Sequence, residues 1–253
     1  MDLRSWGIDL LAWDAWAPGL EDKDKWKQWL AHEKVLPINE EDLLPDANAV
    51  PPRLRRRCSS VSRMALETGL AVCETSGISG EEVNLIFCSR NGELITLKAL
   101  FEDLCISEPL SPTRFSNSVH HTATGYFSLI TKNRRISRTI SGGDDCFACG
   151  LLETCGLLDK YPEIPVLLFY CDEFVPQPFD EMLEKPEFPF SVAMMLKRNS
   201  ESPAFQVGFE THNQVRKTLP KGPDSVFSFL NWLQNEEPSH YMETAFGGLT
   251  WKR

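Results

Sequence analysis

The sequence lacks the features that mark membrane proteins, exported proteins and nucleic-acid-binding proteins. No apolar run approaches the roughly 20 residues that a membrane-spanning helix needs. The first six residues show no basic segment followed by an apolar one, so no export signal is predicted and a cytoplasmic location is expected. The chain has 26 Lys and Arg against 36 Asp and Glu, and this net charge of −10 argues against binding to nucleic acid.

Cysteine patterns that would build a metal site or a disulfide framework are also missing. The eight cysteines are scattered, and several lie in apolar runs typical of reduced core thiols: Cys73, Cys88, Cys105 and Cys171. Cys146 and Cys149 form a single CxxC without a second pair, which favours buried helix thiols over a zinc or redox site. The sequence therefore predicts no metal ion and no cofactor.

The chain does contain an alternation of two apolar patterns. Continuous apolar runs bounded by turn residues predict strands at 6–13, 84–89, 136–141, 165–171 and 190–196, with 205–209 as a further hairpin partner. Apolar residues at helical spacing predict helices at 21–35, 53–75, 93–104, 119–131 and 145–158, and a last amphipathic helix around 226–233. This order predicts an α/β sheet layered by helices, in one domain that covers residues 1–253.

A strand, a glycine turn and a helix follow one another at residues 138–158. The β-branched run that ends at Ser141 breaks at Gly142 and Gly143, and a small-residue apolar helix follows. Such an elbow presents one side chain and several backbone N–H groups at a helix N-terminus. Asp144 and Asp145 lie at the turn, and we expect the Asp144 carboxylate to cap the helix.

Two blocks around this elbow carry a resemblance. Residues 115–131 (FSNSVHHTATGYFSLIT) and 140–154 (ISGGDDCFACGLLET) resemble the N-terminal half of β-ketoacyl synthases, and the similarity extends over roughly residues 3–210. The resemblance implies a single thiolase-like half, with βαβαβαββ order and a five-stranded mixed sheet in the order 3-2-1-4-5. It also implies a dimer formed edge to edge through the third strand. Beyond the region of resemblance, we expect an extra helix and strand segment at the C-terminus.

Two departures from the family pattern bear on function. Counted from Gly125, the position of the ketosynthase nucleophile falls on Asp144, and a carboxylate does not form the acyl thioester of thiolate chemistry. The chain also ends before a His-Gly-Thr or Gly-Phe-Gly-Gly motif of the second thiolase half. It is therefore similar to chain length factors, in particular the short form of aryl polyene pathways. The resemblance implies a non-catalytic subunit that pairs with a complete β-ketoacyl-ACP synthase, shapes its acyl tunnel and meets acyl carrier protein through the complex.

The same resemblance implies which residues meet the partner. The expected interface and tunnel residues are Asn117, His121, Thr122, Tyr126, Phe127, Ile130, Arg138 and Ile140. Thr122, Tyr126 and Ile130 share a helix face by their spacing, and ordinary core packing is the alternative for the aromatic residues. The basic residues Arg53, Arg55, Arg56 and Arg57 are candidates for contact with the carrier protein, or form a solvated helix face.

Other functions remain open from the sequence. Cys146 with His120 or His121 as the base would make an independent acyl-transfer enzyme. A scaffolding protein that keeps the fold but does not affect product length is a third reading. A homodimer through the same strand edge is also compatible with the sequence.

Overall fold

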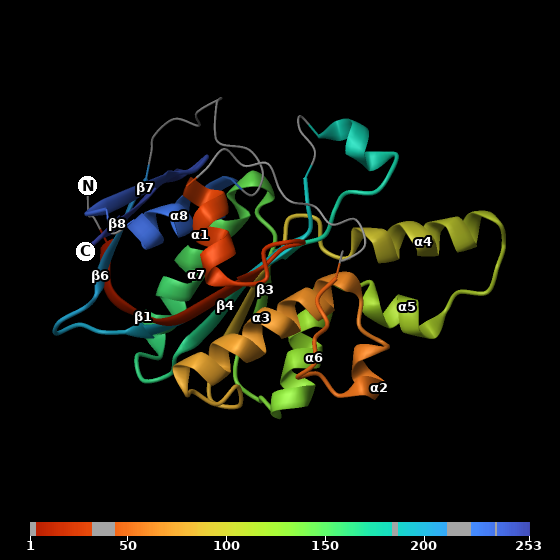
Figure 1. Cartoon of the computed structure of the whole chain (residues 1–253), viewed down its shortest axis with the longest axis horizontal. Helices are drawn as coiled ribbons and strands as arrows, with labels where there is room; N and C mark the ends of the chain where they lie inside the picture. Colours follow the sequence, from red (N-terminus) through yellow and green to blue (C-terminus); the bar gives the residue numbers. More distant parts are fainter. Residues whose placement is uncertain (1–3, 32–43, 184–186, 212–223, 236) are drawn as a thin grey trace.

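The computed structural model describes residues 4–31, 44–183, 187–211, 224–235 and 237–253. These residues form one eight-stranded mixed sheet with helices on both of its faces (Figure 1). The strands are β1 (Arg4–Trp16), β2 (Asn84–Cys88), β3 (Ser137–Ile140), β4 (Val166–Asp172), β5 (Phe190–Arg198), β6 (Phe205–Thr211), β7 (Ser239–Glu243) and β8 (Gly247–Lys252). The helices are α1 (Lys23–Ala31), α2 (Pro52–Arg55), α3 (Ser60–Ser76), α4 (Leu94–Cys105), α5 (Pro112–Asn117), α6 (Thr122–Thr131), α7 (Cys146–Lys160) and α8 (Asp224–Asn235), with 3₁₀ turns η1 (Gly143–Asp145) and η2 (Phe179–Met182).

The fold class predicted from the sequence is confirmed, but the strand order is different. The sheet runs β3-β2-β4-β5-β1-β6-β8-β7, so the first five strands have the order 3-2-4-5-1 rather than 3-2-1-4-5. Strand β4 is buried along its whole length, as a strand between two neighbours and under helices on both faces must be. Strand β1 has exposed and half-exposed positions and pairs antiparallel with both β5 and β6. The fully buried run therefore takes the place next to β2 that was assigned to the first strand.

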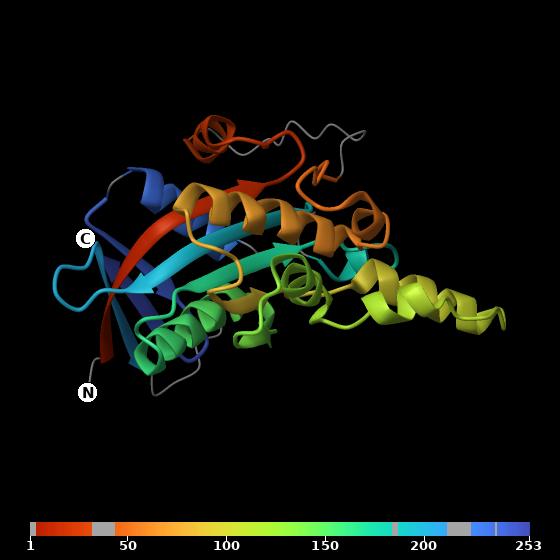
Figure 2. The same cartoon turned by 90° about the horizontal axis from the view of Figure 1, so that it is seen from below.

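Alternate side chains of the central strands enter two cores, one on each face of the sheet. Ile86, Leu168 and Tyr170 pack in the core beneath α1, α7 and α8. Leu85 and Phe169 belong to the core on the opposite face, beneath α3 and α6. Figure 2 shows the sheet from its side, between these helical layers.

Several helix boundaries differ from the sequence prediction for local reasons. The predicted helix 53–75 is two helices, because Ser59 caps α3 by accepting a hydrogen bond from the Ser62 backbone N–H at 3.1 Å. The segment 107–118, expected to be a loop, contains α5, which begins at Pro112 and is capped by Ser111. Residues 32–35 of the predicted helix 21–35 lie outside the described residues.

The C-terminal segment completes the sheet. Strand β8 pairs with β6, and β7 forms the last strand beyond it. Helix α8 buries the aromatic residues Phe227, Phe229 and Trp232 against this part of the core. Trp26 of α1 stacks on Phe227 with ring centroids 6.0 Å apart, so α1 is packed against α8.

Candidate functional site

The elbow predicted between residues 138 and 158 is present. Strand β3 ends at Ile140, the chain passes through Gly142 and the 3₁₀ turn η1, and α7 begins at Cys146. A Cβ atom on Gly142 would lie 2.9 Å from Cys149 Sγ and 3.2 Å from Cys146 Cα, so only glycine fits this close approach of turn and helix. The turn therefore places Asp144, which follows the two glycines, near the N-terminus of α7.

Asp144 is held by an ion pair. Its Oδ1 lies 3.3 Å from Arg90 Nη1, and Arg90, which follows β2, also forms an ion pair with Glu187. The prediction that Asp144 caps α7 is wrong: Asp145 is the N-cap residue, and its side chain makes no capping bond. Asp145 instead accepts a hydrogen bond of 2.8 Å from the Ala245 backbone N–H in the β7–β8 turn. The carboxylates of the elbow thus bind it to Arg90, which follows β2, and to the C-terminal hairpin.

The structure does not bring Cys146 together with either histidine. Cys146 is fully buried, and its Sγ lies 3.5 Å from the Ile140 carbonyl oxygen. Burial raises the pKa of Cys88, and a hydrogen bond from its thiol lowers the pKa of Cys146 against the effect of burial. His120 Nε2 is 3.1 Å from the Ser89 carbonyl oxygen, and burial lowers the pKa of this histidine. Among the described residues, no hydrogen bond joins Cys146 to His120 or His121, so the thiol–imidazole pair that nucleophilic catalysis needs is absent there.

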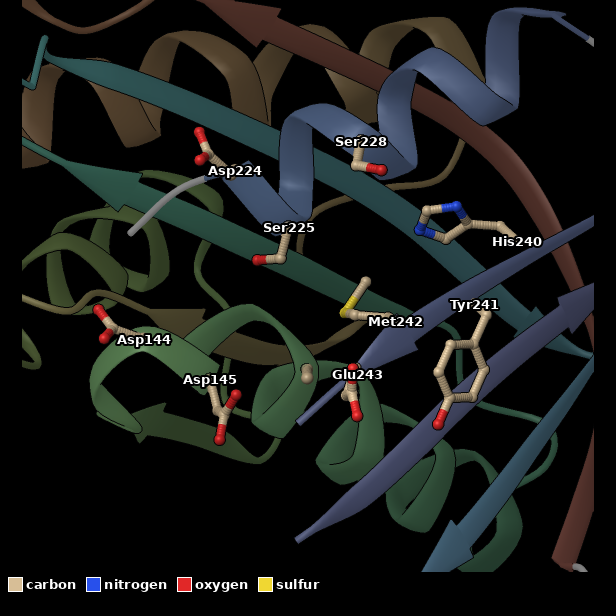
Figure 3. Close-up of a pocket in the computed structure, with 10 residues that line it drawn as sticks. Asp144, Asp145, Asp224, Ser225, Ser228, His240, Tyr241, Met242 and Glu243 are labelled. Atoms are coloured by element: carbon tan, nitrogen blue, oxygen red, sulfur yellow. The ribbon is translucent and has the colours of Figure 1, made fainter. Parts of the chain in front are cut away.

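A cavity of about 230 Å³ opens beside the elbow, between η1, α8 and β7 (Figure 3). Four carboxyl groups line it, and no cysteine does. The lining residues are Asp144, Asp145, Ala148, Asp224, Ser225, Ser228, His240, Tyr241, Met242 and Glu243. An acidic cavity without a thiol is not suited to acyl-thioester chemistry.

Three buried carboxyl groups gather where β2 and β4 end, and the sequence analysis did not single them out as a cluster. Asp172 accepts hydrogen bonds from Ser89 Oγ at 2.6 Å and from the Asn91 backbone N–H at 2.9 Å. Glu173 Oε1 accepts one of 2.7 Å from the Ile95 N–H, in the first turn of α4. Burial raises the pKa of Asp172 to about 6, of Glu93 to about 7 and of Glu173 to about 8. In the sequence, the signals for this cluster are Asp172 and Glu173 directly after the apolar run at 165–171, and Glu93 shortly after the run at 84–89.

Replacing Glu173 with Gln is expected to stabilise the fold at pH 8 and to have little effect at pH 5. The buried carboxyl has a pKa of about 8 against an ordinary value of 4.5, so the folded state keeps a proton that the unfolded state releases. The stability that this protonated carboxyl contributes is complete below pH 4.5 and is lost as the pH rises towards 8. Over this range the unfolding equilibrium constant rises by up to about tenfold per pH unit. Gln remains neutral and keeps the acceptor for the Ile95 N–H. Urea unfolding at both pH values measures the difference, with exposed Glu163→Gln as the control; equal shifts at pH 5 and 8 would contradict the prediction.

Strand β3 forms one edge of the described sheet and pairs with β2. The Leu85 N–H donates to the Ile136 carbonyl at 2.8 Å, and the Ser89 N–H donates to the Ile140 carbonyl at 3.3 Å. Backbone groups of a strand alternate in direction, so Ser137 and Thr139 direct their N–H and C=O groups away from β2. His121 fixes the start of α6 to this edge, since its Nδ1 lies 2.8 Å from Thr139 Oγ1 and its Nε2 3.2 Å from Ser137 Oγ.

The predicted interface residues of α6 lie mostly on its inner side. Phe127 is buried in the core against Phe169, with ring centroids 5.6 Å apart, so the prediction that it faces a partner is wrong. Thr122 is buried as well, and Tyr126 and Ile130 pack against the same core. The outer face of the helix carries His121, Gly125 and Leu129 instead.

The other predicted interface residues are divided between core and surface. Asn117 is buried, donates to the Arg57 carbonyl at 2.6 Å and accepts from the Tyr126 hydroxyl at 3.1 Å, so it has a structural role. Arg138 is exposed on β3 and forms an ion pair with Glu153 of α7. Ile140 is half-buried and packs against the core beneath α7.

One of the four arginines proposed to contact a carrier protein is held by its own chain. Arg55 binds the loop before α2, with its Nη1 2.9 Å from Asn48 Oδ1 and 3.0 Å from the Asp46 carbonyl. Arg53, Arg56 and Arg57 are exposed. In the described parts of the chain, no helix is long and apolar enough to cross a membrane, and no group of three or more His, Cys, Asp or Glu side chains could hold a metal ion.

Comparisons with known proteins agree with this architecture. A search of curated protein sequences finds no match. A chain in the structure of the ketosynthase ApeO in complex with its chain length factor ApeC from Xenorhabdus doucetiae is 25% identical, with a TM-score of 0.79, and the alignment covers 98% of this chain and 99% of that one. Two further structures match at 12% identity and share the fold. These are the ishigamide ketosynthase/chain length factor (TM-score 0.63, 81% of this chain and 67% of that one) and a β-ketoacyl synthase from Burkholderia phymatum STM815 (TM-score 0.62, 92% and 71%).

The family assignment rests on sequence as well as fold. The sequence model described as β-ketoacyl synthase, N-terminal domain, matches residues 26–251, which is most of the chain. It includes the elbow, the edge strand β3 and the C-terminal hairpin. The chain therefore belongs to the β-ketoacyl synthase family, through its N-terminal domain.

Proposed function

We propose that this chain is a non-catalytic, chain-length-factor-type subunit of a β-ketoacyl-ACP synthase. It pairs along β3 with a complete ketosynthase and contributes to the wall of the acyl tunnel, in aryl polyene or related fatty-acid or polyketide synthesis. The observation that carries the proposal is Asp144: the elbow is intact, but its presented residue is a carboxylate held by Arg90 instead of a thiol.

The similarity to the ApeO–ApeC complex supports the assignment. The matched chain in that complex is nearly as long as this one, since the alignment covers almost all of both. The β-ketoacyl synthase from Burkholderia phymatum is longer, because the alignment covers 92% of this chain but 71% of that one. A protein that corresponds over its whole length to a chain of a ketosynthase–chain length factor complex fits the role of a paired subunit.

The tunnel wall is assigned to exposed apolar residues rather than to Phe127. Phe115 and Val119, at the passage from α5 to α6, are 64% and 55% exposed, and Leu129 on α6 is 63% exposed. Bulky side chains at such positions would limit the length of an acyl chain by steric exclusion. The exposed residues Arg53, Arg56 and Arg57 remain the candidates for contact with an acidic carrier protein.

The proposal predicts that the chain forms no condensation product alone and that Asp144→Cys does not change this. The variant would have a thiol, but the contacts of His120 and His121 leave no base beside it. The test combines the chain with a complete ketosynthase from the same organism, malonyl carrier protein and starter, and analyses carrier-bound products by mass spectrometry. Turnover by the isolated chain or by Asp144→Cys would favour the independent enzyme.

Product length separates a tunnel subunit from a scaffold. Phe115→Ala in an intact pair should lengthen the products or broaden their distribution, because it removes bulk from the proposed wall. Leu11→Ala is the control, since Leu11 is 41% exposed on β1, which β2, β4 and β5 separate from β3. Identical product lengths for wild type, Phe115→Ala and Val119→Ala would favour the scaffolding protein.

A further inference from the structure

Helices α4 and α5 form an arm that extends away from the sheet. Figures 1 and 2 both show it projecting from one end of the molecule. Of the 12 residues of α4, only Leu100 is buried. Phe101, Leu104 and Ile106 are 63%, 54% and 69% exposed, and Leu110 in the connection to α5 is also exposed. We call these four residues the apolar arm surface.

The arm is a preformed hairpin. Arg114 Nη1 of α5 lies 2.8 Å from Asp103 Oδ2 of α4, which holds the two helices together. At its base, the Ile95 N–H donates to Glu173 and Thr96 bonds Glu93, so the start of α4 is fixed to the ends of the strands. A fixed base and an exposed apolar tip present the surface in a defined direction.

The stability of such a helix depends on packing. Short helices are marginal in water, and most of their stability in proteins comes from an apolar face packed against other elements. An exposed apolar patch on a protein without a membrane-spanning helix in its described parts marks an interaction surface. We therefore expect the packing that α4 lacks among the described residues to come from another molecule.

The charges of the arm favour a protein as that molecule. Between residues 94 and 117 there are two basic residues, Lys98 and Arg114, and three acidic ones, Glu102, Asp103 and Glu108. Lys98 pairs with Glu102 and Arg114 with Asp103, so the basic groups are already neutralised. An anionic lipid surface or nucleic acid would require an excess of free basic residues.

The contact area that β3 and α6 offer is small for a stable complex, which favours the ketosynthase as the molecule that also binds the arm. Stable protein complexes bury about 800 Å² on each partner, contributed by about 20–30 residues. Strand β3 has four residues, and the outer face of α6 adds few more. Helix α5 of the arm leads directly into α6, and His121 at the start of α6 is bound to β3, so the arm is joined to the edge proposed for pairing.

We propose that the arm is a clasp that docks on the complete ketosynthase and buries the apolar arm surface against an apolar face of that partner. This inference rests on the proposed function, since it assigns a second contact area to the same pair. The open strand β3 aligns the two sheets, and the clasp supplies the apolar contact that a four-residue edge lacks.

The test is a triple variant, Phe101→Ser, Leu104→Ser and Ile106→Ser, compared with Leu11→Ser, which changes an exposed apolar residue of β1. The dissociation constant of the complex with the complete ketosynthase is measured by titration of a labelled chain. We expect the triple variant to raise it by about 100-fold or more and the control to leave it unchanged. The circular dichroism melting curve of each free variant checks that the fold is retained.

Hydrogen exchange of the unmodified pair gives a second readout that does not depend on variants. Amides of residues 101–110 should become protected when the ketosynthase is added. Unchanged affinity of the triple variant, or no added protection, would overturn the clasp and leave the proposed pairing standing. If the arm amides are already protected when the chain alone forms a homodimer, the apolar arm surface binds a second copy of this chain. That result would overturn the proposal. A wild-type chain that does not bind the ketosynthase would instead contradict the proposed function itself.

Discussion

Replacing Thr139 with proline is expected to abolish pairing with a complete ketosynthase while the isolated chain keeps its fold. The N–H of Thr139 points away from β2, because the bonds to β2 involve Ile136 and Ile140. Proline removes this outward donor and places its ring where a partner strand would approach, which edge strands of isolated proteins tolerate. We expect the dissociation constant of the pair to rise by at least about 100-fold, measured by titration or by co-elution in gel filtration.

Thr139→Val is the matched control for this substitution. It removes the hydroxyl that bonds His121, as proline does, but keeps the backbone N–H. Proline at Arg138 would instead remove a donor directed to β2 and should destabilise the isolated chain. A Thr139→Pro variant that pairs as tightly as Thr139→Val would contradict edge-to-edge pairing. Thr139 is a better position for this test than Ile140, because Ile140 packs against the chain's own core and a substitution there would change folding as well as pairing.

Gly125→Leu should have opposite effects on the isolated chain and on the pair. Gly125 is exposed within α6, and a Cβ atom added there meets no atom within 4 Å. A glycine inside a helix costs about 0.5–1 kcal/mol relative to a good helix former, so leucine should stabilise the isolated chain by about that amount. His121, Gly125 and Leu129 are four residues apart and share one face beside β3, so leucine at the middle position should overpack a closely approaching partner. The expected loss of affinity is about 10- to 100-fold.

Chemical unfolding of the free variant and titration with the ketosynthase measure the two effects separately. Glu74→Leu, on the exposed side of α3, is the control for adding an apolar side chain to a helix surface. A Gly125→Leu chain that is stabilised and binds normally would place the partner elsewhere. No contact in the structure would then explain why glycine occupies position 125.

Local patterns in the sequence located the elbow and six of the eight strands of the described sheet, whereas β7 and β8 were not predicted individually. The Gly142–Gly143 break and the apolar run at 84–89 are short-range signals, and the structure has the elbow at this break and β2 at Asn84–Cys88. Strand order depends on pairing between distant segments, such as Asn84 with Val166, and periodicity carries no information about it. The order was therefore taken from the resemblance, and it was wrong.

The error on α6 has a related cause. The four-residue spacing of Thr122, Tyr126 and Ile130 correctly predicts a shared face, but spacing does not reveal whether that face meets a partner or the core. Phe127 lies in the core because aromatic side chains contribute large buried areas, and the outer face is marked by the less conspicuous Gly125. Helix α4 of the arm was predicted at 93–104, but the solvent exposure of its apolar side chains became visible only in the structure.

The position of β1 in the sheet has a consequence for the order in which the chain assembles. This strand is synthesised before the other strands of the described sheet, and its two neighbours, β5 and β6, are synthesised much later. Ile8 pairs with Arg198 of β5 on one side and with Phe205 of β6 on the other. Contacts between such distant segments form slowly, because a long loop must close before they stabilise anything. The neighbouring strands β2, β3 and β4 are closer together in sequence and can associate earlier. During synthesis the backbone of β1 therefore stays unpaired until β5 and β6 have left the ribosome. In this interval the nascent chain is most prone to aggregation.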